Sequence, residues 1–204
     1  MKGLIGKKLG TTQVFLEDGS CVGVTVVEAG PCRVSQVRTE DKDGYSAVQL
    51  GYGVKKEKNA TKSEVGHFAK AGAPVAAIVH EFDIVGETPA LGADITVTIF
   101  EGVKTVNVKG TSKGRGFAGT IKRHNFRRGR ETHGNVNHRA PGSAGSHTYP
   151  ARTFPGKKFP GQYGNKNCTV SNLSLVKVDA ERNLLFIKGA IPGPINGTVF
   201  VEKN

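Results

Sequence analysis

Residues 103–119 read VKTVNVKGTSKGRGFAG, and the character of the chain changes within this stretch. Its first half alternates polar and β-branched residues as far as Val108, which is typical of a β-strand with one buried face. The second half, from Gly110 to Gly119, contains four glycines and the cations Lys113 and Arg115. Glycine weakens regular structure because it loses the most conformational freedom on folding. The sequence therefore predicts that a β domain is interrupted here by a segment of another kind.

Short β-branched runs bounded by Gly, Asp or Asn lie on both sides of this stretch, and such runs are typical of strands. They predict strands at 23–27, 33–37, 45–50, 95–100, 103–108, 169–178, 184–187 and 198–201. Asp18-Gly19 and Asn196-Gly197 indicate hairpin turns. One helix is expected from an N-cap at Ser63 to Ala71, ended by Gly72. Many short strands indicate an antiparallel barrel or sandwich, and we expect a mainly β protein built on an antiparallel β-barrel.

The charge of the chain is concentrated in its centre. The 204 residues contain 29 Lys and Arg against 17 Asp and Glu, a formal net charge of +12. Residues 104–166 hold fourteen of these cations and one acid, Glu131, which is a net charge of +13 and leaves −1 for the rest. A solvated surface normally mixes both signs. The segregation therefore predicts a polyanionic partner.

Few large apolar residues occur between Thr111 and Gly164, so burial cannot offset the entropy of ordering this part of the chain. We expect it to be disordered in the free protein and to fold on its partner. The predicted organisation is a discontinuous barrel domain formed by residues 1–111 and 165–204, with a small α+β insert at about 55–92. Residues 112–164 form the basic extension.

Gly114, Gly116 and Gly119 satisfy the GxGxxG pattern of dinucleotide-binding loops directly after a predicted strand. That site also needs a βαβ unit and an acid about 20 residues further on, which binds the ribose. No parallel strand follows here, and Glu131 is the only acid before Asp179. Glycine also lets backbone N–H groups approach a phosphate closely. Beside these cations, an anion-binding loop is the better interpretation.

Other site classes are weakly supported. His124, His133, His138 and His147 are scattered and have no nearby cysteine or carboxylate pair to complete a zinc site, so we expect no metal site. No pattern of paired carboxylates, GxSxG or Cys-His indicates an enzyme. Cys21, Cys32 and Cys168 are expected to be free, buried thiols. The N-terminus lacks the apolar core of a signal peptide, and no apolar run is long enough to span a membrane.

The candidate binding residues are the glycines, cations, imidazoles and one aromatic and one hydroxyl side chain of the extension. Guanidinium groups bind phosphate and stack on bases, and aromatic side chains also stack on bases. For each aromatic side chain, a local packing contact is the alternative interpretation. The candidates are Lys113, Gly114, Arg115, Gly116, Phe117, Gly119, Lys122, Arg123, His124, Arg127, Arg128, Arg130, His133, His138, Arg139, Ser146, His147, Arg152, Lys157 and Lys158.

The central run also carries a family resemblance. Phe100, Asn107, the run Gly110–Gly116, Gly119 and Arg123 resemble, in identity and spacing, the signature of the bacterial-type L-three family of large-subunit ribosomal proteins. Further stretches resemble other parts of that family over nearly the whole chain, namely residues 1–10, 29–32, 43–51, 66–68, 133–134, 138–143 and 188–193.

The resemblance implies a barrel of the kind shared with translation factors and an extension that threads into the large-subunit rRNA toward the peptidyl transferase centre. It implies early, direct binding near the 3′ end of that rRNA, which nucleates subunit assembly in the cytoplasm. Neighbouring ribosomal proteins are implied partners, without a cofactor, small-molecule substrate or membrane, and any Mg²⁺ would belong to the rRNA. Some relatives carry a methylated glutamine, but residues 145–150 read GSHTYP here, so that modification is not expected.

Two other functions stay open on the sequence. A general nucleic-acid chaperone with a basic arm would bind any RNA with little site preference. A nucleotide-dependent oxidoreductase, suggested by GRGFAG, would bind a dinucleotide saturably.

Overall fold

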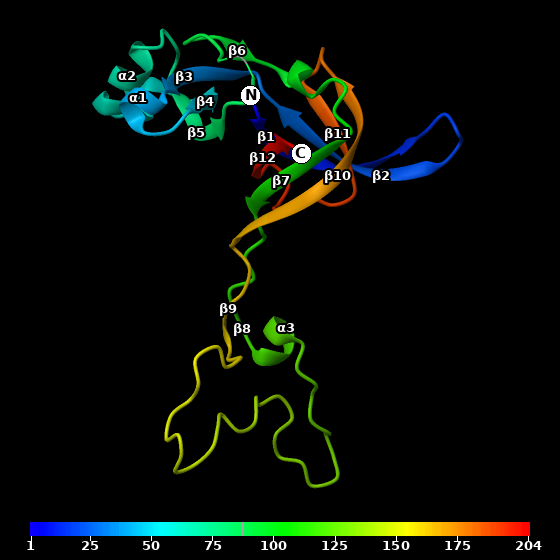
Figure 1. The fold of residues 1–204 in the computed structure, drawn as a ribbon. Helices are drawn as coiled ribbons and strands as arrows, with labels where there is room; N and C mark the ends of the chain where they lie inside the picture. The colour runs from blue at the N-terminus through cyan, green and yellow to red at the C-terminus, as the bar shows by residue number, and fades with distance from the viewer. Residues whose placement is uncertain (87) are drawn as a thin grey trace. The chain divides into compact units, whose positions relative to one another are not determined.

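The computed structural model describes residues 1–86 and 88–204, which form two compact units (Figure 1). Unit 1 comprises residues 1–112 and 167–204, and unit 2 comprises residues 113–166. In the described residues, no helix is long and apolar enough to cross a bilayer.

Unit 1 contains a closed six-stranded barrel whose strands pair antiparallel in the order β1-β12-β7-β10-β11-β2. The predicted mainly β fold with an antiparallel barrel is confirmed. The strands span Gly3–Phe15 (β1), Cys21–Ala29 (β2), Thr105–Thr111 (β7), Asn167–Asp179 (β10), Leu184–Lys188 (β11) and Thr198–Lys203 (β12).

The barrel core follows the alternation in the sequence. Buried residues alternate with less buried ones along β7, β11 and the first part of β12, and pairs such as Val106 and Val108, or Val199 and Val201, are fully inaccessible. Each such side chain contributes about 1.5–3 kcal/mol through burial. Strand β1 differs, because its first residues contact β4 and β5 as well as the barrel and are buried on both faces.

A four-stranded antiparallel sheet in the order β5-β4-β3-β6 packs on the same core. Val34, Val48, Leu50 and Phe82 on one face of this sheet are buried in the shared hydrophobic cluster. The elements here are β3 (Cys32–Arg38), α1 (Glu40–Asp43), β4 (Ala47–Val54), a 3-10 helix (Glu57–Asn59), α2 (Lys62–Ala69), β5 (Ala76–Asp83) and β6 (Asp94–Ile95).

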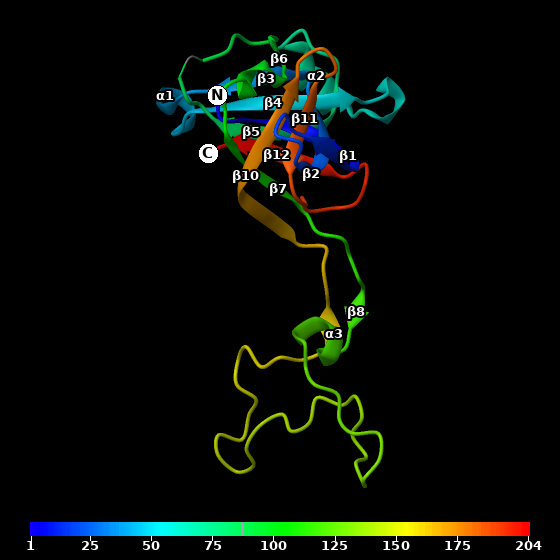
Figure 2. The same cartoon turned by 90° about the vertical axis from the view of Figure 1, so that its right-hand side faces the viewer.

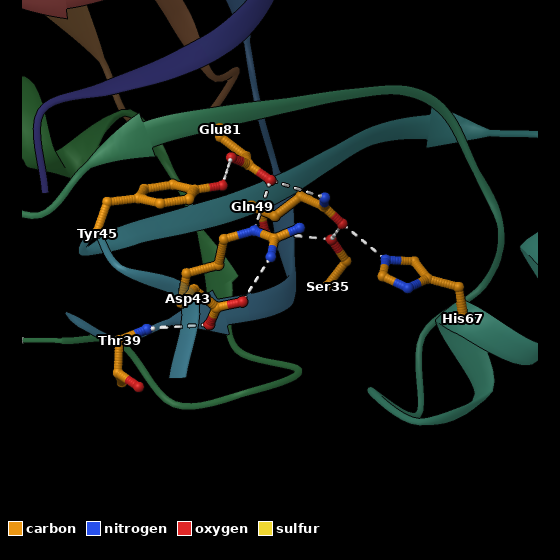
Figure 3. Close-up of polar contacts among 8 residues, drawn as sticks. Ser35, Thr39, Asp43, Tyr45, Gln49, His67 and Glu81 are labelled. Atoms are coloured by element: carbon orange, nitrogen blue, oxygen red, sulfur yellow. Dashed lines mark hydrogen bonds and ion pairs between the residues drawn. The ribbon is translucent and has the colours of Figure 1, made fainter. Parts of the chain in front are cut away.

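The opposite face of this sheet carries charged groups that bind one another (Figure 3). Arg38 donates from Nε to Glu81 at 3.0 Å and from Nη1 to Asp43 at 2.7 Å, and the Tyr45 hydroxyl donates to Glu81 at 2.8 Å. Burial raises the pKa of Glu81, but the bonds from Tyr45 and Arg38 outweigh it and hold that pKa below its ordinary value. Glu81 is therefore a carboxylate whose charge is already compensated.

Gln49 extends this network toward α2 (Figure 3). Its Nε2 donates to Glu81 at 3.3 Å, while its Oε1 lies 2.8 Å from the Ser35 hydroxyl and 2.7 Å from Nε2 of His67. Because a carbonyl oxygen only accepts, His67 carries its proton on Nε2. The polar side chains of this face thus have partners within the protein.

Several local predictions are wrong. Residues 95–100 are not a strand: β6 ends at Ile95, and Val97–Phe100 is a 3-10 helix. Its three-residue repeat places Val97 and Phe100 on one face, where both are buried. Strands β1 and β5 were not predicted, because β1 contains three glycines and β5 mixes apolar and charged residues without clean alternation.

The predicted helix exists but begins earlier. Its N-cap is Thr61 instead of Ser63, since the Thr61 hydroxyl accepts from the Glu64 N–H and the Glu64 carboxylate accepts from the Thr61 N–H. The helix ends at Ala69, before Gly72 with φ 62°. Asp18-Gly19 lies in the hairpin of β1 and β2 as predicted. Asn196-Gly197 is no hairpin turn, because β11 pairs with β10 and β2 whereas β12 pairs with β1 and β7.

The three cysteines are free, as expected, but only Cys32 is buried. Burial raises the pKa of the Cys32 thiol to about 12. Cys21 and Cys168 are exposed. They lie on barrel strands at positions that face solvent, so the expectation of three buried thiols is wrong.

Candidate nucleic-acid interface

Unit 2 holds most of the charge. Residues 113–166 contain twelve lysines and arginines and one acid, a net charge of +11, whereas unit 1 contains seventeen cations and sixteen acids. The regular elements of unit 2 are β8 (Phe117–Ala118), α3 (Thr120–His124) and β9 (Gly161–Gln162). Between α3 and β9 the chain forms no helix or strand (Figures 1 and 2).

The two ends of unit 2 pair with each other to form what we call the stem, residues 113–124 and 159–166. Strands β8 and β9 are antiparallel, with Phe117 opposite Gln162. Next to this pair, on the side toward Lys113, the N–H of Arg115 donates to the Tyr163 carbonyl and the N–H of Tyr163 donates to the Gly116 carbonyl, both at 2.9 Å. The stem is therefore continuous from Arg115 to α3.

Glycine permits the tight approach in the stem. Gly164 has φ 70°, and a Cβ there would stand 2.0 Å from the carbonyl oxygen of Lys113. Gly116 also has positive φ, whereas Gly119 is the N-cap of α3 with open space around it. The GxGxxG glycines thus shape an antiparallel stem. Among the described residues no parallel strand follows α3, which removes the structural basis for a dinucleotide site.

Two cations and an imidazole of the stem contact other stem residues. The Arg115 guanidinium lies 5.2 Å from the ring centre of Tyr163, a cation–π contact. The carbonyl oxygen of Phe159 accepts from Nη1 of Arg123 at 2.7 Å and lies 3.0 Å from Nε2 of His124. These contacts join α3 to the segment that leads into β9.

The remaining loop of unit 2, residues 125–158, is held by a few local contacts. The N–H of Gly129 donates to the carbonyl of His138 at 3.0 Å, and Nδ1 of His138 lies 2.8 Å from the Arg130 carbonyl. Arg128 forms an ion pair with Glu131, the one acid of this unit. Arg128 is therefore partly neutralised, whereas Arg127 takes part in no ion pair of the residues that the structure describes.

Exposure separates the twenty candidate residues into two groups. Three are half-buried, namely Arg123, His124 and His138, and these are the three whose side chains contact backbone carbonyls. The other seventeen are exposed: Lys113, Gly114, Arg115, Gly116, Phe117, Gly119, Lys122, Arg127, Arg128, Arg130, His133, Arg139, Ser146, His147, Arg152, Lys157 and Lys158. The structure thus places most candidate cations in solvent, where an anion can reach them.

Exposed aromatic rings accompany these cations. Phe117 is 80% exposed, Tyr149 90% and Phe154 61%. Local packing, the alternative for each aromatic in the sequence, does not account for these three. It does apply to Tyr163 under Arg115 and to Phe126 near His124. Exposed rings beside guanidinium and ammonium groups are suited to bases and phosphates of a single-stranded nucleic acid.

Sequence reasoning missed the residues that close the stem, namely Gly161, Tyr163 and the carbonyl of Phe159. The available signal was the second glycine-rich run from Gly161 to Gly164, which mirrors the run from Gly114 to Gly116. Within residues 1–86 and 88–204, no group of three His, Cys, Asp or Glu side chains could hold a metal ion.

Comparison with known proteins gives one consistent result. The family model described as ribosomal protein L3 matches residues 48–185. A "large ribosomal subunit protein uL3" of Thioalkalivibrio sulfidiphilus is 52% identical over 204 residues, which cover 98% of this chain and 95% of the relative. The proteins of that name from Vibrio cholerae serotype O1 and Syntrophotalea carbinolica are 53% and 49% identical and cover 99% and 100% of this chain, and 98% of each relative.

Proposed function

The chain belongs to the ribosomal protein L3 family, a non-enzymatic family of structural constituents of the large ribosomal subunit, and from this premise we propose that it binds large-subunit rRNA directly through unit 2. The proposal includes binding near the 3′ end of that rRNA, nucleation of subunit assembly and placement of unit 2 toward the peptidyl transferase centre. These finer points follow the family resemblance of the central signature. The proposed place of action is the ribosome in the cytoplasm.

The observation that carries the proposal is the separation of charge between the two units. A net charge of +11 in 54 residues, with seventeen candidate residues exposed, suits a phosphate backbone. Unit 1 has nearly equal numbers of cations and acids. A partner of high negative charge density is therefore bound by unit 2, and in a large ribosomal subunit that partner is rRNA. Any Mg²⁺ at this interface is assigned to the rRNA, and no cofactor is proposed.

Footprinting on intact large-subunit rRNA tests this function. The purified full-length chain is expected to protect a discrete set of nucleotides, above the background seen on unrelated RNAs of similar length. A general chaperone would instead protect all RNAs weakly and without fixed positions. Uniform protection of unrelated RNAs would therefore contradict the proposal.

A further inference from the structure

A second concentration of positive charge lies in unit 1, around α2. Residues 54–75 contain five lysines and two glutamates, a net charge of +3, while the rest of unit 1 has twelve cations and fourteen acids. The small positive charge of unit 1 therefore comes from this one segment. The charge pattern of the extension does not predict this second basic segment, because its lysines lie outside residues 104–166.

An apolar groove of about 420 Å³ runs along this segment. Val54 and Val65 are 76% and 45% exposed, although both side chains are apolar. Single exposed apolar residues are common on protein surfaces, but here they share one hollow with four other apolar residues. The residues that line it are Val54, Lys55, Glu57, Val65, Ala69, Ala73, Pro74 and Val75.

Exposed lysines lie close in sequence to the residues that line this groove. Lys62, Val65 and Ala69 are three and four residues apart on α2 and so share one helix face. Since Val65 and Ala69 line the groove, Lys62 lies on the helix face that borders it. Lys56 and Lys58 flank Glu57, another lining residue, and Lys70 directly follows Ala69.

These four lysines differ from Lys55 in their pairing. The Lys55 ammonium lies 2.9 Å from both carboxylate oxygens of Glu64, the residue that caps α2. Lys56, Lys58, Lys62 and Lys70 are exposed, and none takes part in the ion pairs described for residues 1–86 and 88–204. Their charge is available to a partner, in contrast to the internally compensated network around Glu81.

We propose that this groove is a second binding site for large-subunit rRNA, in which lysines hold phosphates and the apolar floor receives a ribose or an unstacked base. The inference rests on the proposed function and adds a site outside unit 2. Lysine ammonium groups bind phosphate as point charges, and unstacked bases place their apolar faces on protein surfaces. Glu57, which only accepts hydrogen bonds as a carboxylate, supplies an acceptor for a 2′-hydroxyl or exocyclic amine.

Two triple variants of the full-length chain test this site by footprinting on intact large-subunit rRNA. The first is Lys58→Ala/Lys62→Ala/Lys70→Ala. The matched control is Lys42→Ala/Lys177→Ala/Lys188→Ala, which removes three exposed lysines elsewhere in unit 1. The first variant is expected to lose one protected rRNA segment, to keep the others, and to lower the log–log salt slope by about 2. The control is expected to keep the full footprint and slope.

A third variant tests the groove separately from its charge. Ala69→Leu fills part of the groove and leaves all four lysines, so the same rRNA segment should be protected severalfold less strongly, at an unchanged salt slope. If the lysine variant keeps every protected segment and the wild-type slope, the site is wrong. If the lysine variant keeps every protected segment but fails to enter assembling subunits, the groove binds a protein instead of rRNA. That result also overturns the proposal. Absence of any discrete wild-type footprint would instead contradict the proposed function itself.

Discussion

The guanidinium of Arg123 occupies space that a side chain at Gly161 would need. A Cβ at Gly161 would lie 2.7 Å from Nη1 of Arg123 and 3.1 Å from its Cζ. From this position Nη1 donates to the Phe159 carbonyl. Arg123, the last residue of the family signature in the sequence, therefore contributes to closing the stem.

Replacing Gly161 by alanine should loosen the stem. The added methyl group displaces the Arg123 guanidinium from Phe159, and a lost hydrogen bond to a charged group costs about 1.5 kcal/mol, less where it is partly exposed. Trypsin should cut faster after Lys122 and Arg123, and rRNA affinity should fall about three- to tenfold. Gly119→Ala is the matched control, because nothing lies within 4 Å of a Cβ there and its φ is −68°. Equal behaviour of the two variants would contradict the role of Gly161.

Salt dependence separates phosphate contacts from stem contacts. Neutralising about 6–10 phosphates predicts a log–log slope of about −4 to −9 for the wild type, and a slope of −1 or −2 would contradict binding along the backbone. Lys122→Ala and Arg127→Ala should each reduce the slope by about 0.7–0.9. Arg123→Ala should lower affinity with a smaller change in slope, because its guanidinium binds Phe159. A larger slope change for Arg123→Ala than for Lys122→Ala would show that Arg123, and not Lys122, contacts phosphate.

Limited trypsin digestion of the RNA-free protein should show where unit 2 is ordered. The loop 125–158 has few backbone hydrogen bonds, so the first cuts are expected after Arg127, Arg139 or Arg152. Cuts in the stem should follow later, and rRNA should protect the loop. Equal early cleavage at Arg115 and Arg139 would show that the stem does not form in the free protein.

Stability should depend on pH through His80. Its ring stacks on Phe82 at 4.9 Å and meets Phe200 edge-on at 4.0 Å. Burial first and Lys109 second lower the pKa of His80, while Glu81 and Glu202 act in the opposite sense. Below about pH 6.5 the unfolded state therefore binds more protons, and stability falls as pH falls.

The variant His80→Phe keeps the ring packing and removes this titration. Thermal unfolding of the wild type should occur at lower temperature at pH 5.5 than at pH 7.5, and this difference should shrink in the variant. The other histidines are common to both proteins, so they cancel in the comparison. An identical pH dependence would exclude His80 as its source.

Sequence alone predicts the strands that bury one face and expose the other, and the segment that is recognised by its charge. Strands β7, β11 and β12 alternate cleanly because one face meets the core, and the charge of residues 104–166 needs no fold to be recognised. Strand β1 escapes prediction because its start is buried on both faces and Gly3 and Gly6 pack against backbone, as Gly3 does against the Val201 carbonyl.

The candidate site shows the same limit. Composition identifies the cations, but it does not distinguish Arg123, which binds Phe159, from Lys122, which is exposed. That distinction depends on the pairing of β8 with β9, between residues more than forty positions apart. The α2 groove likewise depends on bringing Val54 beside Val65 through β4 and the helix. Contacts distant in sequence were the part that could not be predicted.

Binding of rRNA by a chain whose extension has been replaced decides whether unit 2 or unit 1 is the main binding surface. A short Gly/Ser linker in place of residues 113–164 removes eleven cations and Glu131, lowering the net charge from +12 to +2. Every barrel strand lies outside the replaced residues, and loop closure depends weakly on length, so a cooperative thermal transition should remain. We predict that this folded variant loses most of its affinity for large-subunit rRNA and most of the salt slope. A folded variant that binds the rRNA with undiminished affinity and slope would contradict the account, because unit 1 would then be the main binding surface.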